Sequence, residues 1–221
     1  MGYGTEHIVS LYSTGWYSWI LLALGICAIL SEVFQPGIMT GATASVFAHS
    51  ERMYKQTPDN FPGQLSATLF RIGTPALMLV MISRDRFDST ADGIASYGIA
   101  FGIIVAVLLL ETAINSLIDY TFELKAYAAG IGTHIANIAT LICFGLYPAI
   151  LVLPLAGSMT ANRWVACVFA IAYLGITTYR LVRLFMSGAK SIIYILMYVF
   201  TLEVLPMGVL VAGMSQMMKI I

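Results

Sequence analysis

Charged side chains are scarce in this sequence. Asp, Glu, Lys and Arg together make up 10% of its 221 residues, whereas hydrophobic residues make up 59%. Soluble globular proteins carry about 25% charged residues, because their surfaces must stay hydrated. This composition excludes an ordinary water-soluble domain. It predicts that much of the surface contacts a lipid bilayer.

An excess of either charge sign is also missing. Eleven Lys and Arg residues balance eleven Asp and Glu residues, so the formal net charge is zero. A nucleic-acid partner or long-range electrostatic steering would depend on such an excess. We therefore expect no nucleic-acid partner, and any argument from charge has to be local.

Cysteines and recognisable reaction motifs are few. Cys27, Cys143 and Cys167 each stand alone in an apolar run, so we interpret them as small hydrophobic side chains rather than metal ligands or a redox pair. The sequence has no phosphate-binding loop, no His-Glu-x-x-His zinc motif and no nucleophile elbow. We expect no metal, no cofactor and a non-enzymatic protein, although scattered carboxylates leave a membrane-embedded enzyme open.

Long apolar runs are what the sequence does contain. A bilayer core about 30 Å thick requires about 20 apolar residues for a helix to cross it. The runs predict an all-α membrane protein, a bundle of about six transmembrane helices that forms one domain over residues 1–221. The predicted spans are residues 17–34, 65–82, 97–118, 130–155, 164–184 and 191–213.

The segment between the first two predicted spans has a mixed character. Residues 39–56 carry charged side chains on some faces and four apolar side chains near helical spacing, namely Met39, Val46, Met53 and Tyr54. This pattern indicates an interfacial amphipathic helix. The span that follows, 65–82, is short and contains Arg71 and Pro75, so we expect it to be tilted or partly interfacial.

Basic residues indicate an orientation, because Lys and Arg accumulate in cytoplasmic loops. On the side of the loops after the first, third and fifth spans lie Arg52, Lys55, Arg71, Lys125, Arg180, Arg183 and Lys190. The opposite side has Arg84, Arg86, Arg163 and Lys219. We expect the loops after the odd-numbered spans to be cytoplasmic.

Ionisable side chains at bilayer depth are the leading candidates for a functional site. A charge at the centre of a span costs about 2.5 to 3.5 kcal/mol on insertion scales. Glu203 lies near the middle of the last predicted span, and Glu111 follows a long aliphatic run in the third. Their carboxylates would transfer protons, coordinate a cation or form ion pairs. Arg71 and Arg180 are the cationic candidates to neutralise them.

A polar stripe continues along the third predicted span. Four residues recur at four-residue steps, namely Glu111, Asn115, Asp119 and Glu123. This spacing places them on one side of a helix. The stripe either lines a polar cavity or marks a helix that emerges into the interface with its polar face toward other helices. Both interpretations stay open at this point.

Two further pairs of residues are candidates for contacts between helices. His134 and Asn137 lie one turn apart near the start of the fourth predicted span, where they would form interhelical hydrogen bonds. Gly98 and Gly102 form a Gly-x-x-x-Gly step, which allows close approach of another helix, within the chain or in a dimer.

The closing segment carries a more specific signal. It reads Tyr198-Val199-Phe200-Thr201-Leu202-Glu203-Val204-Leu205-Pro206, and it resembles the terminal signature of the domain of unknown function 4271 (DUF4271) family. The stretch from Ser50 to Tyr54 also looks similar. This resemblance implies a multi-spanning protein of the cytoplasmic (inner) membrane of Bacteroidota with a role in the cell envelope. It implies no catalytic residue, because the family is uncharacterised.

Three functions fit these features. The favoured one is a non-enzymatic structural or assembly subunit of an envelope complex, bound to a membrane-protein partner or a second copy of the chain, in which buried charge pairs fix the helix register. The alternative is a small transporter or proton-coupled carrier that uses the carboxylates in mid-membrane. The third is an intramembrane enzyme that acts on a lipid-linked substrate, whose headgroup the basic interfacial helix would recruit.

Overall fold

The computed structural model describes residues 15–47, 60–82, 90–122, 125–156 and 159–185. This part of the chain is entirely helical apart from short turns, which confirms the predicted all-α class. Its helices are α2 (Gly15–Phe34), α3 (Ile38–Phe47), α4 (Phe61–Ile82), α5 (Thr90–Phe122), α6 (Lys125–Ala156) and α7 (Met159–Phe185).

Five of these helices are long and apolar enough to cross a membrane. Their apolar segments are Gly15–Phe34, Phe61–Ile82, Ala91–Ala113, Ile135–Leu153 and Thr160–Tyr179. They correspond to the first five predicted spans, and the chain is therefore a multi-pass membrane protein. The sixth predicted span, 191–213, lies outside the described residues.

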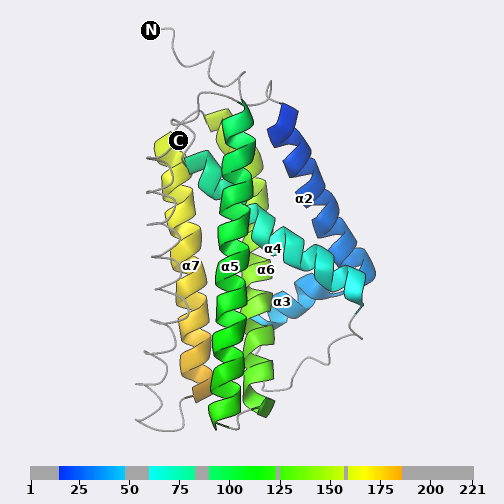
Figure 1. The fold of residues 1–221 in the computed structure, drawn as a ribbon, viewed down its shortest axis with the longest axis vertical. Coiled ribbons are helices and arrows are strands. Elements are labelled where there is room, and N and C mark those ends of the chain that lie inside the picture. Colours follow the sequence, from blue (N-terminus) through cyan, green and yellow to red (C-terminus); the bar gives the residue numbers. More distant parts are fainter. Residues whose placement is uncertain (1–14, 48–59, 83–89, 123–124, 157–158, 186–221) are drawn as a thin grey trace.

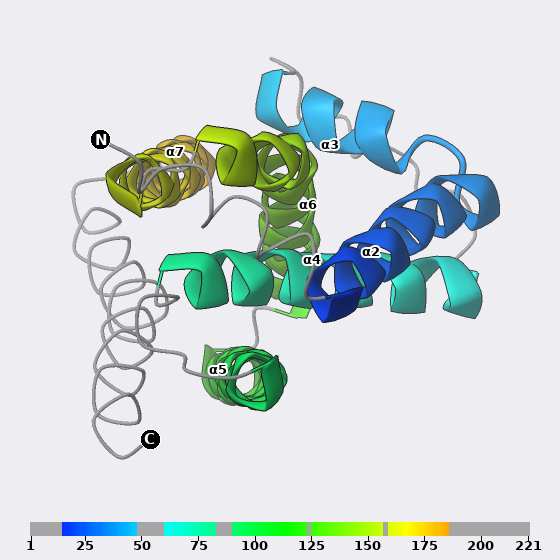
Figure 2. The ribbon, with the colours of Figure 1, turned by 90° about the horizontal axis from the view of Figure 1, so that it is seen from above.

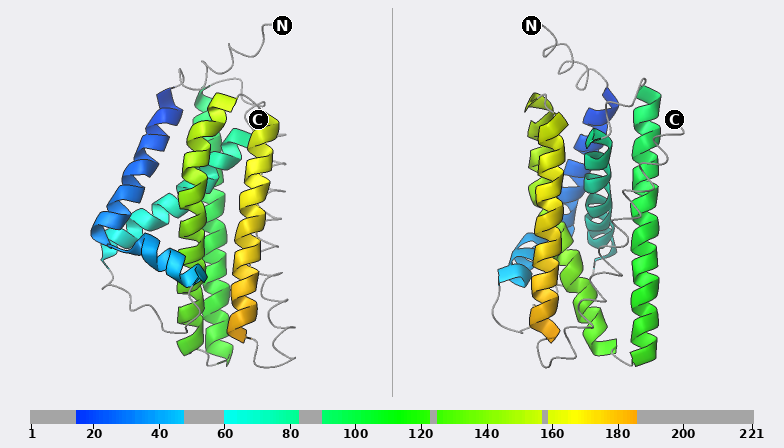
Figure 3. Two further views of the ribbon diagram at one scale, coloured as in Figure 1. Left: turned by 180° about the vertical axis from the view of Figure 1, so that it is seen from behind. Right: turned by 90° about the vertical axis from the view of Figure 1, so that its left-hand side faces the viewer.

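The helices alternate in direction, so α2, α5 and α7 end on the same side of the bundle (Figure 1). Figure 3 shows from two further sides that the last turns of α5 and α7 and the first turns of α6 reach well beyond the turn between α2 and α4. The bundle is therefore longer at this end along α5, α6 and α7 than along α2 and α4.

Helix α4 occupies the centre of the bundle. It contacts α2, α5, α6 and α7, and it passes obliquely between α5 on one side and α6 with α7 on the other (Figure 2). The buried share of its apolar segment is 61%, compared with at most 33% for the other four. The predicted span that contains Arg71 and Pro75 is thus the one that its neighbours shield most from lipid.

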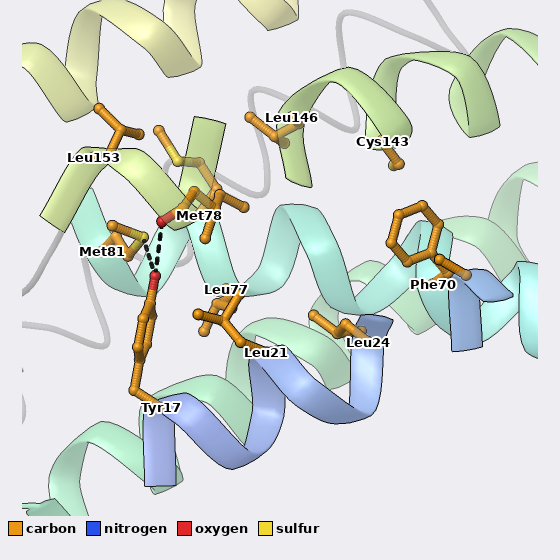
Figure 4. Close-up of a cluster of buried hydrophobic side chains, with 12 residues drawn as sticks. Tyr17, Leu21, Leu24, Phe70, Leu77, Met78, Met81, Cys143, Leu146 and Leu153 are labelled. Carbon is orange, nitrogen blue, oxygen red and sulfur yellow. Dashed lines mark hydrogen bonds between the residues drawn. The ribbon is translucent and has the colours of Figure 1, made fainter. Parts of the chain in front are cut away.

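The main core lies where α2, α4 and α6 meet (Figure 4). It consists of Tyr17, Leu21, Leu24 and Ala28 from α2, Phe70, Leu77, Met78 and Met81 from α4, and Cys143, Leu146, Ile150 and Leu153 from α6. Apart from the adjacent Leu77 and Met78, these residues recur within each helix at steps of three, four or seven, which is the period of one helical face. A smaller cluster joins the opposite face of α4 to α5 through Ile72, Ala76, Val80, Ala100 and Ile104.

Helix α4 begins earlier than the expected residue 65. It starts at Phe61 and includes Pro62, because a proline in the first turn of a helix removes an N–H that would have no intrahelical acceptor. Gly63 follows, and a Cβ at this position would come within 3.1 Å of the Cβ of Gln35. Glycine thus permits the close contact between the start of α4 and the end of α2.

A helix, α3, covers the first part of the range 39–56, for which the sequence predicts an interfacial amphipathic helix. Residues 48–59 lie outside the described part. Two Glu32 carboxylate oxygens accept hydrogen bonds from the backbone N–H groups of Gly37 (2.9 Å) and Met39 (3.2 Å). Glu32 thereby caps the start of α3. The helix packs along α6, with Gly41 and Ala42 buried.

Candidate functional site

Arg71 lies at the midpoint of α4 and is half-buried. Its Nε donates a hydrogen bond to the carbonyl oxygen of Ala67 at 3.3 Å, and its Nη2 donates to Oγ1 of Thr68 at 2.9 Å. Both acceptors belong to α4 itself. A guanidinium has five N–H donors, so part of its hydrogen-bonding capacity is not used by the residues that the structure describes.

Two other helices have a residue near this guanidinium. Tyr173 of α7 and Cys143 of α6 lie within electrostatic range of Arg71, which places the charge at the junction of α4, α6 and α7. Three carboxylates have described side chains, namely Glu32, Asp92 and Glu111. Arg71 forms no ion pair with any of these three. Within the described residues, its positive charge is therefore not neutralised.

The backbone of Arg71 is also part of the site. Proline has no N–H, so Pro75 cannot donate to the carbonyl four residues earlier, which is that of Arg71. The thiol of Cys143 on α6 donates to this oxygen, with a sulfur to oxygen distance of 3.7 Å. A freed carbonyl inside a membrane protein requires such a partner. Cys143 is therefore more than the small hydrophobic side chain expected from the sequence.

The same arrangement recurs at the other end of the core. Pro154 frees the carbonyl of Ile150 on α6. The hydroxyl of Tyr17 on α2 points toward this oxygen at 3.2 Å and toward Sδ of Met81 on α4 at 3.1 Å (Figure 4). Tyr17 is 1% exposed. Its single hydroxyl thus links three helices around a proline-freed carbonyl.

The third interhelical hydrogen bond, made by Tyr147, depends on a glycine. The hydroxyl of Tyr147 on α6 donates to the carbonyl oxygen of Leu21 on α2 at 3.0 Å. A Cβ at Gly25 would lie 2.6 Å from this hydroxyl oxygen, which is closer than real Cβ contacts allow. Gly25 therefore provides the space that the hydroxyl occupies, and α2 and α6 are tied together at two points along their length.

Two buried threonines complete the polar groups of this region. Thr74 on α4 and Thr177 on α7 are 0% and 1% exposed, and the Oγ1 atoms of both lack a hydrogen-bond partner in the described part of the chain. By contrast, Thr140 donates to the carbonyl of Ala136 at 2.8 Å. An unpaired buried hydroxyl costs about 1 to 3 kcal/mol, so these positions are not explained by the described helices alone.

The sequence-predicted site residues are only partly brought together. Glu111 is half-buried on α5, and Asn137 is half-buried on α6. Neither meets Arg71. The backbones of Asn115, Asp119, His134 and Arg180 lie in α5, α6 and α7, but their side chains are outside the described part. Glu203 falls outside it completely, so the predicted roles of these five residues stay predictions.

The Gly-x-x-x-Gly step is open in the described structure. Gly98 and Gly102 are exposed, and a Cβ at either would meet nothing within 4 Å. The close helix contacts are made instead at glycines that the sequence did not single out. Besides Gly25, a Cβ at Gly93 would come within 2.7 Å of Trp16. The described residues also contain no group of three or more His, Cys, Asp or Glu that could hold a metal ion.

Two of the interhelical contacts that the sequence did not reveal share one signal, which is a proline four residues after the accepting carbonyl. Position i−4 from an interior proline identifies the carbonyl that needs a donor, here that of Arg71 for Pro75 and that of Ile150 for Pro154. The donors themselves, Cys143 and Tyr17, come from other helices. Only the packed structure identifies them.

These features define the class of the protein, a multi-pass α-helical membrane protein with an arginine in the middle of its central, shielded helix. The model of the family described as domain of unknown function (DUF4271) matches residues 17–214, so the chain belongs to this family. The match confirms the family expected from the closing segment. No curated protein and no solved structure matches the chain.

Proposed function

We propose that this chain is a non-enzymatic structural subunit of a complex in the cytoplasmic membrane, where it assembles with another membrane protein. The observation that carries the proposal is the way α2, α4 and α6 are fastened to one another. Cys143, Tyr17 and Tyr147 each donate a hydrogen bond from one helix to a backbone carbonyl of another. Two of these carbonyls, those of Arg71 and Ile150, have no intrahelical donor because the residue four positions later is a proline.

These interhelical hydrogen bonds favour a core whose helices do not move relative to one another. Alternating access in a carrier requires groups of helices to rock against each other around a central site. Separation of α2 or α4 from α6 would leave the carbonyls of Arg71 and Ile150 without a donor. Each unsatisfied backbone group in the bilayer core costs several kcal/mol. A protein whose helices are held in this way suits a scaffold.

The ends of α5 and α6 offer a surface for a partner. α5 ends at Phe122 and α6 begins at Lys125, and both reach beyond the turn between α2 and α4 (Figure 3). The sequence of this hairpin includes Asp119, Glu123 and Lys125. Its predicted cytoplasmic location would place a partner on that side.

The experiment is purification of the tagged full-length chain from its native membrane in a mild detergent, with mass spectrometry of proteins and small molecules. We expect a partner in constant stoichiometry. Reversal of two charges in the projecting hairpin, Asp119→Lys with Lys125→Glu, should abolish its recovery. The matched control reverses two charges in the loop at the other end of the bundle, Arg84→Glu with Asp85→Lys, and should retain it.

The carrier is the second candidate, and one observation favours it. The guanidinium of Arg71 has N–H donors that the described residues do not use, which is a suitable environment for an anionic substrate. Suppose that the chain purifies without a protein partner and retains a small anion, and that the Arg71→Gln variant does not retain it. A carrier is then the better-supported function than a structural subunit.

A further inference from the structure

The middle of α4 is open on one side only. Within residues 70–81, all residues are buried except Arg71, Pro75 and Leu79, which are half-buried. These three recur at four-residue steps, so they share one side of the helix. Most of the other residues in this stretch pack into the main core or into the smaller cluster with α5. Arg71, the single charged residue of α4, therefore lies on the side that a ligand can reach.

The guanidinium is held in place by its own helix and still has donors left. Nε binds the carbonyl oxygen of Ala67, and Nη2 binds Oγ1 of Thr68. Two of the five N–H groups are thus used, so three remain among the described residues, two on Nη1 and one on Nη2. N–H groups on both terminal nitrogens can bind two oxygens of one oxyanion. Because the two existing bonds fix the plane of the group, these donors are already oriented.

The hydroxyl of Thr68 adds another donor beside the guanidinium. A threonine inside a helix commonly donates to a carbonyl three or four residues earlier, as Thr140 does to Ala136. Thr68 makes no such bond within the described residues, and its Oγ1 instead accepts from Nη2 of Arg71 at 2.9 Å. The hydrogen of this hydroxyl is therefore left for an acceptor next to the guanidinium.

Donors outnumber acceptors around this group. None of the three described carboxylates pairs with Arg71, and the thiol of Cys143 on α6 is itself a donor, bound to the Arg71 carbonyl. On α7, Thr177 lies one turn after Tyr173, the residue within electrostatic range of Arg71. The buried Oγ1 of Thr177 has no partner in the described part of the chain. A positive charge among free donors suits an anion, because a cation or a neutral acceptor-poor ligand would leave the charge uncompensated.

We propose that Arg71 and Thr68 bind a phosphate group, which comes either from free inorganic phosphate or from the headgroup of a phospholipid. Two phosphate oxygens accept from the terminal nitrogens of Arg71, and a third accepts from the Thr68 hydroxyl. A carboxylate has only two oxygens and would leave one of these donors unused. Arginine binds phosphate well because its planar group offers paired N–H donors. The inference does not rest on the proposed function, since a bound phosphate group is compatible with a structural subunit and with a carrier.

Binding to the purified full-length chain tests the site. The chain is delipidated in a mild, phosphate-free detergent solution and titrated with inorganic phosphate in a calorimeter. In parallel, native mass spectrometry records whether it retains added phosphatidylglycerol or a diacylglycerol with the same acyl chains. We expect one phosphate or one phosphatidylglycerol per chain, and no diacylglycerol. Phosphate binding without lipid retention identifies the free anion as the ligand, whereas retention of phosphatidylglycerol without phosphate binding identifies the headgroup.

Conservative variants assign the binding to these two residues. Thr68→Val keeps the shape of the side chain and removes its donor, and Arg71→Lys keeps the charge and removes the paired N–H groups. Each should weaken binding by about tenfold or more. The matched control is Thr140→Val, whose hydroxyl serves its own helix, and it should bind as the natural chain does. The melting temperature without ligand shows that each variant is folded. A natural chain that binds neither ligand, or unchanged affinity in both Thr68→Val and Arg71→Lys, overturns the proposal.

Discussion

Removal of the Cys143 thiol tests how the proline of the central helix is tolerated. Cys143 is 6% exposed, and its thiol is the interhelical donor to the Arg71 carbonyl that Pro75 leaves free. Cys143→Ala leaves this carbonyl without a donor in a buried, apolar setting. A buried acceptor without a partner costs about 1 to 3 kcal/mol. We expect Cys143→Ala to lower the free energy of unfolding by about 2 kcal/mol.

The proline itself provides the decisive comparison. Pro75→Ala restores an N–H that can donate to the Arg71 carbonyl within α4, so the carbonyl no longer depends on Cys143. In the Pro75→Ala background, Cys143→Ala should therefore cost less, by about 1 kcal/mol or more. Cys143→Ser keeps a donor and should cost less than Cys143→Ala in the natural background. Cys167 is exposed, so Cys167→Ala is the matched control and should be neutral.

The assay is reversible unfolding in mixed micelles, in which the denaturing detergent fraction is raised and helix content is followed by circular dichroism. The four chains of the cycle are compared under one condition, and the coupling energy is the difference between the two costs of Cys143→Ala. An equal cost in both backgrounds would refute the reasoning, because the thiol would then contribute only packing.

Three further predictions follow from the contacts between helices. Tyr17→Phe removes the donor to the second proline-freed carbonyl and should lower the free energy of unfolding by about 1 to 3 kcal/mol. Gly25→Ala inserts a Cβ where the Tyr147 hydroxyl lies and should lower the melting temperature, whereas Gly98→Ala faces open space and should not. Glu32→Ala removes the cap of α3 and should cost about 1 kcal/mol, with faster cleavage by protease near this helix.

Each of these predictions has a result that would count against it. Equal stability of Tyr17→Phe and the natural chain would mean that the Ile150 carbonyl does not need the hydroxyl. If Gly98→Ala destabilises as much as Gly25→Ala, the α5 face is covered by another helix. If Glu32→Ala changes neither the stability nor the rate of cleavage, the Glu32 carboxylate does not stabilise the start of α3.

Much of the fold follows from the length and hydropathy of the apolar runs. A bilayer imposes a minimum length on every crossing helix, so runs such as Gly15–Phe34 are visible without any knowledge of their neighbours. Helix α4 illustrates the limit of this approach. Arg71 and Pro75 make its sequence look like a poor span, but its position between α5 and the α6–α7 pair shields it from lipid. Hydropathy measures the residues of a span and not what surrounds them.

The candidate site was less accessible from the sequence. Arg71 stood out because a charge in a span is rare, and the structure places it at the centre of the bundle. The donors Cys143 and Tyr17 could not be recognised, because each is separated from its acceptor by more than 70 residues and resembles an ordinary core side chain. The acceptor is easier to find than the donor. A proline inside a helix identifies the carbonyl four residues earlier as one that needs a donor from elsewhere.

The central claim is that α2, α4 and α6 form a fixed core, and a distance measurement in liposomes tests it most directly. Spin labels replace Trp19 on α2 and Val152 on α6, both of which are exposed, in a chain with Cys27→Ala, Cys143→Ser and Cys167→Ala. Pulsed electron paramagnetic resonance then gives the distribution of distances between the labels. The account predicts one narrow distribution that does not change with pH or an ion gradient. Two populations whose ratio shifts with either condition would contradict it and favour a carrier.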